Sequence, residues 1–93
     1  MIKTFANKET SALFQQVPVR SFPADLLKRS RTKLIMVDVA TTLEELRDPP
    51  GNRLEALIGD RQGQWSIRIN NQWRVCFRFE DGNAYDVEIV DYH

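Results

Sequence analysis

The stretch "GQWSIRINNQWRVCFRFEDGNAYDVEIVDYH", residues 63–93, decides the fold of this chain. Apolar and polar residues alternate along three segments of it, 65–70, 73–79 and 85–92, as in β-strands that bury one face. The buried face is predicted to comprise Trp65, Ile67, Ile69, Trp73, Val75, Phe77, Phe79, Tyr85, Val87 and Ile89. The opposite face is largely polar, so the sequence predicts a sheet with one face toward a core and an open polar face.

The link between the first two strands sets their register. Directly opposed residues of an antiparallel pair point to the same face, so this link must contain an odd number of residues. A three-residue loop, 70–72, places Arg68 opposite Arg74. Opposed like charges destabilise a sheet by roughly several tenths of a kcal/mol unless an anion lies between them. That anion is either a carboxylate of the third strand, Glu88 or Asp86, or a bound phosphate.

The N-terminal half is predicted to be mainly helical. It is expected to form a short strand over 2–5, a short helix over 8–16 and a longer helix over 23–40. Pro23 suits the first turn of the long helix and Asp25 favours its positive end. Leu27, Leu34 and Val37 recur in it at helical spacing.

A capping box is predicted after the long helix, because Thr42 stands three residues before Glu45. "DPPG", residues 48–51, then ends this turn, and strands follow. The predicted fold class is α+β, with two N-terminal helices packed on one face of a small, mainly antiparallel β-sheet. With 93 residues, the chain is expected to form a single domain over 1–93.

The composition of the chain excludes some classes of function. A net charge of zero and a pI near 6.6 argue against a general nucleic-acid coat, which is normally basic. No apolar stretch resembles a signal peptide or a membrane span, so a cytoplasmic protein is expected. The single cysteine, Cys76, excludes an intramolecular disulfide and is interpreted as a packing residue rather than a nucleophile.

Positive charge is concentrated near the N-terminus. Residues 1–40 hold seven Lys and Arg against three acids, whereas residues 41–93 hold six against ten. The excess centres on "LLKRSRTK", which contains Lys28, Arg29, Arg31 and Lys33. Two interpretations stay open: a solvated helix face, or a patch that contacts phosphates or an acidic partner.

The chain ends in Asp91, Tyr92 and His93, the only histidine. Alternation along the last strand predicts that Tyr92 points to the same side of the sheet as Arg68 and Arg74. A terminal tripeptide is often frayed. From the residues alone, two interpretations stay open: a tail, or a functional trio.

Three motifs carry a resemblance to a known family. "PPGNRL" (49–54), "GQWSIRINNQWRVCF" (63–77) and "VEIVDYH" (87–93) resemble the HigB-type toxins of type II toxin–antitoxin systems, within the RelE/ParE superfamily. "IKTF" and "TTLEELRDPPG" are similar to the family more loosely, so the resemblance covers essentially the whole chain. It implies a RelE/ParE-like fold.

The resemblance also implies an activity: ribosome-dependent cleavage of mRNA, without metal or other cofactor, that inhibits translation. The mRNA 2′-hydroxyl attacks the adjacent phosphate and leaves a 2′,3′-cyclic phosphate. Carried over to this chain, the catalytic residues are Arg68, Arg74, Asp91, Tyr92 and His93. The arginines would stabilise the developing charge, His93 would serve as acid or base, and Tyr92 would stack on a base. Asp91 would orient His93 or exchange protons itself.

Partners follow from the same resemblance. They are a HigA-type helix-turn-helix antitoxin, the 70S ribosome and mRNA, with operator DNA contacted only through the antitoxin and no membrane. The basic residues from Lys28 to Lys33 are the expected contact with ribosomal RNA.

The chain departs from the family at two positions. Many relatives carry a His-x-x-Lys pair after "NRL", where this chain has Glu55 and Ile58. Glu55 is either a replacement base or a solvated side chain. Two rival functions stay open: a ParE-like inhibitor of DNA gyrase, which would not need His93, and a relic that only binds antitoxin or acts as a corepressor.

Overall fold

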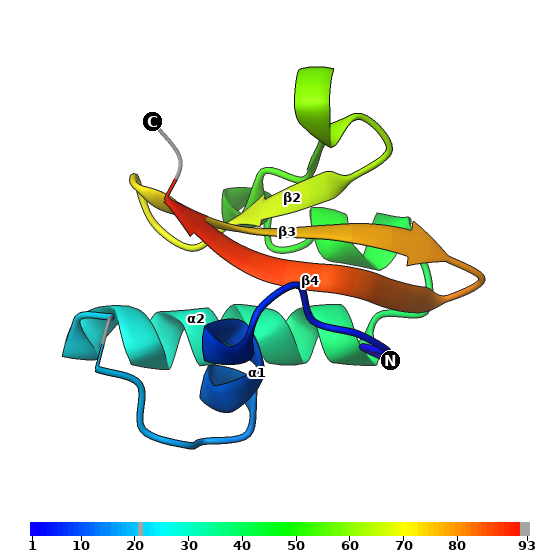
Figure 1. The fold of residues 1–93 in the computed structure, drawn as a ribbon. Coiled ribbons are helices and arrows are strands. Elements are labelled where there is room, and N and C mark those ends of the chain that lie inside the picture. The colour runs from blue at the N-terminus through cyan, green and yellow to red at the C-terminus, as the bar shows by residue number, and fades with distance from the viewer. Residues whose placement is uncertain (21, 92–93) are drawn as a thin grey trace.

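The computed structural model of the protein describes residues 1–20 and 22–91. Its elements are α1 (Lys8–Phe14), α2 (Ala24–Val39), η1 (Leu43–Arg47), η2 (Pro50–Asn52), β1 (Glu55–Ala56), η3 (Gly59–Arg61), β2 (Trp65–Arg68), β3 (Trp73–Glu80) and β4 (Asn83–Asp91), where η denotes a 3₁₀ turn. Within the described residues, four strands form one antiparallel sheet in the order β1-β2-β3-β4. Both α-helices lie on one side of it (Figure 1). The predicted α+β architecture is confirmed.

The long helix α2 forms close to where the sequence predicted it. Pro23 precedes its first residue, and Asp25 lies in its first turn. The side chains that it buries recur at helical spacing and are Leu26, Ser30, Leu34 and Val37. Leu27, predicted to repeat with Leu34 and Val37, is only half-buried, because the preceding leucine takes the innermost position.

The capping box after α2 is confirmed. The Thr42 hydroxyl accepts a hydrogen bond from the Glu45 amide at 3.4 Å, and the Glu45 carboxylate accepts from the amides of Thr41 and Thr42 at 2.6 and 3.1 Å. The hydrogen bonds from these two amides, that of Thr41 first, lower the pKa of the Glu45 carboxyl. The box fixes the direction in which the chain leaves α2 toward η2.

Thr42→Ala is expected to lower the free energy of unfolding by about 1 kcal/mol, because it removes the side-chain cap of η1. Urea unfolding followed by circular dichroism measures the change. Thr32→Ala is the control, since Thr32 is exposed in the interior of α2, where alanine is the better helix former. Equal effects of the two substitutions would contradict the expectation.

Residues 2–5, predicted as a strand, run alongside β4. They form two isolated parallel bridges, Ile2 with Ala84 and Phe5 with Val87, accompanied by backbone hydrogen bonds of 2.8 and 2.9 Å. The N-terminal segment thereby covers an edge of the sheet that would otherwise expose unpaired backbone groups.

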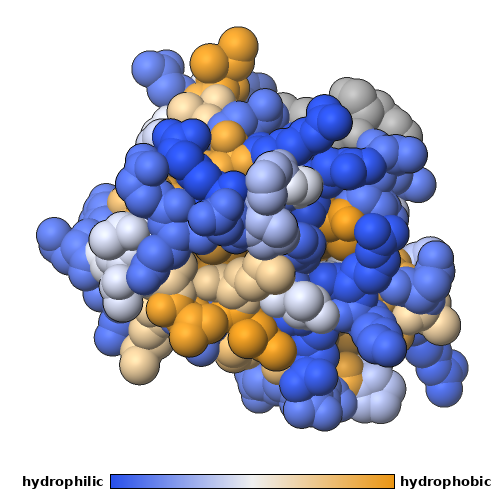
Figure 2. Space-filling view, turned by 180° about the vertical axis from the view of Figure 1, so that it is seen from behind, coloured by the Kyte–Doolittle hydropathy of each residue, from blue (hydrophilic) through white to orange (hydrophobic). Residues whose placement is uncertain are grey.

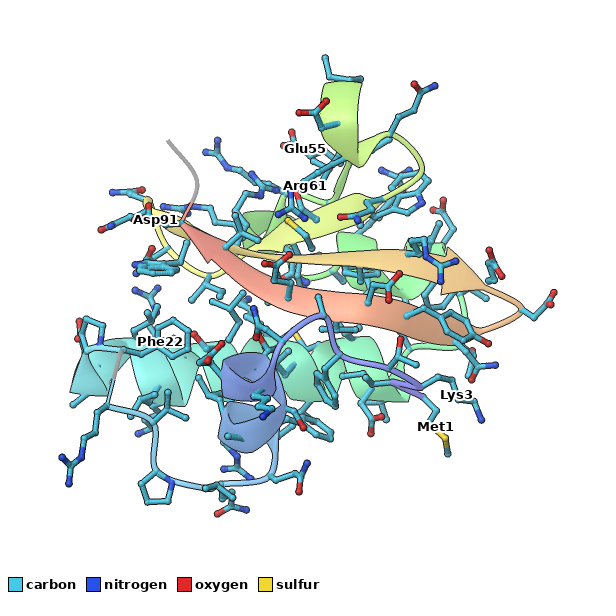
Figure 3. The ribbon with its side chains drawn as sticks, in the orientation of Figure 1. Met1, Lys3, Phe22, Glu55, Arg61 and Asp91 are labelled. Atoms are coloured by element: carbon cyan, nitrogen blue, oxygen red, sulfur yellow. The ribbon has the colours of Figure 1, made fainter. Side chains whose placement is uncertain are left out.

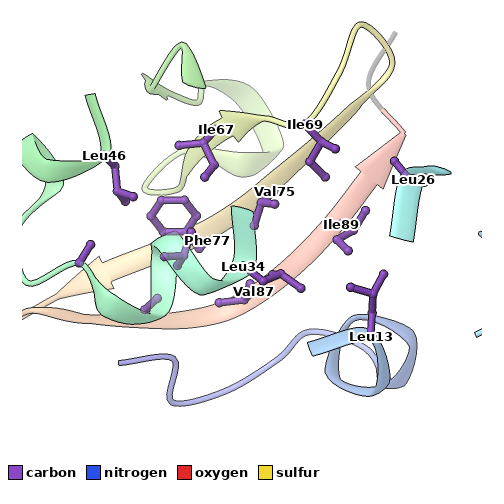
Figure 4. Close-up of a cluster of buried hydrophobic side chains, with 13 residues drawn as sticks. Leu13, Leu26, Leu34, Leu46, Ile67, Ile69, Val75, Phe77, Val87 and Ile89 are labelled. Atoms are coloured by element: carbon purple, nitrogen blue, oxygen red, sulfur yellow. The ribbon is translucent and has the colours of Figure 1, made fainter. Parts of the chain in front are cut away.

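The core lies between α2 and the sheet (Figure 4). Its fully buried apolar side chains include Leu34, Val37, Ile67, Val75, Phe77 and Val87. The alternation of β2 and β3 correctly predicted which of their side chains enter this core. The helices and the inner face of the sheet thus form the scaffold, and the polar face carries the site described below.

A β-bulge changes the alternation of β4. The register between β3 and β4 shifts between Glu88 and Tyr85, and Asp86 there has a left-handed φ of 53°. Tyr85 consequently lies opposite Arg78, whose guanidinium carbon is 5.3 Å from the ring centroid. Ala84 is fully buried instead. The prediction that Tyr85 faces the core was wrong, because simple alternation contains no sign of an inserted residue.

The polar face is covered near its centre. Ser66 and Cys76 are opposed on β2 and β3, and both are fully buried. Residues 57–64, here called the strap, connect β1 to β2 on this side of the sheet (Figure 1), and Arg61 of the strap pairs with Glu88 of β4 at 3.1 Å. The prediction of an open polar face was therefore wrong at this point. Burial raises the pKa of the Cys76 thiol, which fits its interpretation as a packing residue.

Apolar residues also reach the surface. Ile35 and Val39 are exposed on α2, beside a shallow hollow lined in part by Met36 and Leu46. Figure 2 shows an apolar patch on the back of the molecule, surrounded by hydrophilic side chains. None of the helices within residues 1–20 and 22–91 has the length and apolar character needed to cross a membrane.

Candidate active site

The two arginines predicted to face one another do so. Arg68 of β2 is directly opposite Arg74 of β3, as the three-residue loop required. Together with Arg53 they line a cleft of about 230 Å³, and two asparagines of the β2–β3 turn, Asn70 and Asn71, complete its wall. Three arginines around so small a space give the cleft a lining that suits an anion.

The β2–β3 turn holds Arg68 in place. The Asn70 side-chain oxygen accepts hydrogen bonds from the amides of Gln72 and Trp73, both at 2.8 Å, and this closes the turn. Arg68 Nε donates to the Asn70 carbonyl at 3.2 Å, and its Nη2 donates to Asn71 Oδ1. The same turn therefore sets the strand register and orients one guanidinium.

The loop after η2 holds Arg74. Arg74 Nη2 donates to the carbonyl oxygen of Arg53 at 2.7 Å, and only 12% of the Arg74 side chain is exposed. Arg53 has a left-handed φ of 47°, which ends η2 and turns its carbonyl toward the sheet. Glu55 lies on the other side of Arg74, with its Oε1 3.5 Å from Nη1. Glu55 is thus an ion-pair partner at the rim of the cleft.

The carboxylates predicted to separate the two arginines are engaged elsewhere. Glu88 pairs with Arg61 of the strap at 3.1 Å, and Asp86 pairs with Arg78 at 2.9 Å. Of the two alternatives, Glu88 or Asp86 as the internal counter-ion is therefore wrong, and a bound phosphate stays a prediction. The strap and the bulge, neither of which the alternation predicts, redirect both side chains away from the cleft.

The basic run of α2 divides between two sides of the helix. Lys33 is half-buried, and its Nζ donates to Asn52 Oδ1 of η2 at 2.6 Å. Burial, and then the charges of Arg29 and Arg68, lower the pKa of Lys33. Because Asn52 directly precedes Arg53 of the cleft, this end of the run lies beside the loop that borders the cleft. Arg31 instead lines a hollow beside the α1–α2 connection. Lys28 and Arg29 are exposed.

The C-terminal trio is described only in part. Asp91 ends β4 opposite Trp73, and its Oδ2 accepts a hydrogen bond from Gln72 Nε2 at 3.1 Å. Figure 3 shows Asp91 at one end of the sheet, where β4 ends beside the β2–β3 turn. Tyr92 and His93 lie outside the described residues, and so does the prediction that Tyr92 points toward the two arginines.

Sequence reasoning missed two residues of this site. Arg53 lines the cleft, and Asn52 holds Lys33 although no charge marks it. Both belong to "PPGNRL", the motif that carries part of the resemblance. A signal was therefore present, but it gave no reason to connect this loop with residues 68 and 74 of the sheet.

The fold of the chain is similar to that of solved structures. The YoeB–YefM complex from Staphylococcus aureus contains a chain with a TM-score of 0.62 and 15% identity, covering 100% of this chain and 98% of that chain. YafQ from E. coli strain BL21(DE3) has a TM-score of 0.56 and 13% identity, covering 98% and 93%.

By its sequence, the chain belongs to the HigB-like toxin family, whose members are RelE-like toxins. The family model described as "RelE-like toxin of type II toxin-antitoxin system HigB" matches residues 3–93. Endoribonuclease HigB of Proteus vulgaris is 38% identical over 93 residues, which is 100% of both chains. Toxin HigB-1 of Vibrio cholerae serotype O1 is 42% identical over 65 residues, covering 70% of this chain and 68% of that protein.

Proposed function

We propose that this protein is a ribosome-dependent endoribonuclease that cleaves mRNA and thereby inhibits translation in the cytoplasm. The observation that carries the proposal is the cleft between Arg53, Arg68 and Arg74, found in a member of a toxin family. The relative from Proteus vulgaris is named an endoribonuclease, which supports the reaction class.

The cleft suits the group on which RNA cleavage takes place. Its volume of about 230 Å³ is below the roughly 300–1,000 Å³ of pockets for drug-sized ligands, so it fits a phosphodiester better than a large cofactor. Arg68 and Arg74 are fixed before substrate arrives, because each guanidinium donates to a backbone carbonyl. Preorganised donors stabilise the charge that develops on phosphorus-bound oxygens without reorganising during the reaction.

The proposed reaction needs no metal. The 2′-oxygen loses its proton and bonds to the adjacent phosphorus, the bond from phosphorus to the 5′-oxygen breaks, and that oxygen leaves protonated. A 2′,3′-cyclic phosphate remains. Asp91, Tyr92 and His93 are proposed to supply the proton transfers and base stacking, with their individual roles left open.

The proposed partners are the 70S ribosome with its mRNA and a helix-turn-helix antitoxin of the HigA type, through which operator DNA would be contacted. The solved YoeB–YefM complex, a toxin–antitoxin pair, supports an antitoxin partner. Lys28, Arg29, Arg31 and Lys33 are the proposed contacts with RNA on the ribosome, since cations bind the phosphate backbone and two of these residues, Lys28 and Arg29, are exposed.

Primer extension on a defined mRNA in a purified translation mixture tests the proposal. Cuts that appear with ribosomes and disappear without them are the expected result. Cleavage of free mRNA at the same rate would remove the ribosome from the proposal. If no cut appears at saturating protein, a DNA supercoiling assay with gyrase distinguishes a gyrase inhibitor from an inactive relic, and either outcome overturns the nuclease.

Glu55→Gln is expected to lower the cleavage rate by about tenfold, because Arg74 loses the carboxylate that holds one side of its guanidinium. The rate is measured in the same primer-extension assay. Glu80→Gln is the matched control, since Glu80 pairs with Arg78 at 3.1 Å away from the cleft. A loss of a hundredfold or more would make Glu55 the proton acceptor. A faster variant would mean that the carboxylate competes with the phosphate.

A further inference from the structure

Lys33 is held in place by a buried asparagine. Asn52 is fully buried. Its side-chain nitrogen donates to the carbonyl oxygens of Leu46 and Asp48, both at 3.2 Å. With its N–H groups directed at carbonyls, the amide presents its oxygen to Lys33 Nζ at 2.6 Å. The ammonium group therefore has a fixed position before any ligand binds.

After burial, the charges that lower the pKa of Lys33 are those of two cations, Arg29 and Arg68. Arg29 lies one helical turn earlier on the same side of α2. η2, which carries Asn52, packs against β2, the strand that ends at Arg68. The lowered pKa of Lys33, caused first by burial and then by Arg29 and Arg68, agrees with this proximity. Across residues 1–20 and 22–91, no carboxylate forms an ion pair with Lys33.

Such a group of cations suits an external anion, and the substrate supplies one. An RNA strand carries a negative charge at every nucleotide. The cleft accommodates little more than one phosphodiester, so the next phosphate of the strand must lie outside it. Asn52, which holds the Lys33 ammonium group, directly precedes Arg53, which lines the cleft, so the held ammonium group lies against the loop that borders the cleft.

We propose that Lys33 and Arg29 form a second phosphate subsite, which binds the RNA phosphate next to the scissile one, and that Asn52 is its positioning residue. The inference rests on the proposed function, because it takes the arginine cleft as the place of the scissile phosphate. It separates Lys33 from Lys28 and Arg31 of the same basic run. Arg31 lines the hollow toward α1, and the exposed Lys28 has no comparable clasp among the described contacts.

The test pairs a change in the protein with a change in the RNA. The cut site of the natural chain is first mapped on a defined mRNA bound to ribosomes. Two further mRNAs then carry a neutral methylphosphonate in place of the phosphate on the 5′ or the 3′ side of the scissile one. Cleavage rates are compared for the natural chain, Lys33→Met and the control Lys28→Met.

For the natural chain, one of the two methylphosphonates is expected to lower kcat/KM by roughly tenfold, the size of one charge-assisted hydrogen bond. Lys33→Met is expected to show the same loss on unmodified mRNA and no further loss on that methylphosphonate. Lys28→Met should keep the full sensitivity. Additive losses from Lys33→Met and the methylphosphonate at both positions would overturn the subsite.

Asn52→Ala tests the positioning role. It should remove the sensitivity to the same methylphosphonate, as Lys33→Met does, although Lys33 is still present. Because the substitution also leaves two carbonyls without a donor, thermal unfolding is measured in parallel. A folded Asn52→Ala variant that keeps full sensitivity would contradict the positioning role, and an unfolded variant leaves the decision to Lys33→Met. Absence of any cleavage by the natural chain would instead overturn the proposed function itself.

Discussion

Arg74→Ala is expected to lower the rate of mRNA cleavage by roughly 10²–10³-fold, the loss typical of removing one preorganised donor to a developing oxyanion. Only 12% of the Arg74 side chain is exposed, so its charge is largely enclosed. Its guanidinium is aimed by the Arg53 carbonyl on one side and by Glu55 on the other. Alanine removes the charge and both of these contacts.

Single-turnover cleavage on programmed ribosomes measures this loss, and thermal unfolding shows that the variant is folded. Arg78→Ala is the matched control, because Arg78 also lies on β3 and pairs with Asp86 and Glu80 away from the cleft. Arg78→Ala should cleave at nearly the natural rate. Equal losses in the two variants would mean that the sheet, and not the cleft, was damaged.

His93→Ala is expected to lower the cleavage rate by roughly 10²–10⁴-fold, the usual contribution of a general acid or base. This prediction comes from the sequence, in which His93 is the only histidine. With an unperturbed pKa of about 6.5, an imidazole changes its protonation near neutral pH, so the pH–rate profile should lose a limb in that region in the variant.

The readout is again primer extension with ribosomes, at several pH values. A gyrase supercoiling assay runs in parallel, because a gyrase inhibitor on the same fold has no need of a terminal proton donor. Toxicity that survives the substitution, together with inhibited supercoiling, would replace the nuclease by the gyrase inhibitor. An unchanged cleavage rate would remove His93 from the catalytic group.

The opposition of Arg68 and Arg74 was predictable from the sequence, because parity alone fixes which residues can face one another across a short turn. The capping box at Thr42 and Glu45 was predictable for a similar reason, since its spacing is local. Features that depend on a few neighbouring residues can be read along the chain.

The errors have a different origin. Tyr85 was assigned to the wrong face because one bulged residue, Asp86, reverses the alternation before it. Glu88 was one candidate counter-ion for the arginines, but the strap brings Arg61 to it from another part of the chain. The role of Arg53 depends on a loop folding against the sheet. Each of these needs a tertiary contact that no local pattern encodes.

The strap over the polar face gives the protein an internal reporter. Cys76 is the only cysteine of the chain, and it is fully buried on the side of the sheet where the strap lies. A thiol reagent can reach it only when the strap lifts or the whole molecule unfolds. The rate at which an aromatic disulfide labels Cys76 therefore reports how often this region opens, and no probe has to be introduced. Comparing the labelling rate of the free toxin with that of its complexes would show which partners slow the opening of the strap and which leave it unchanged.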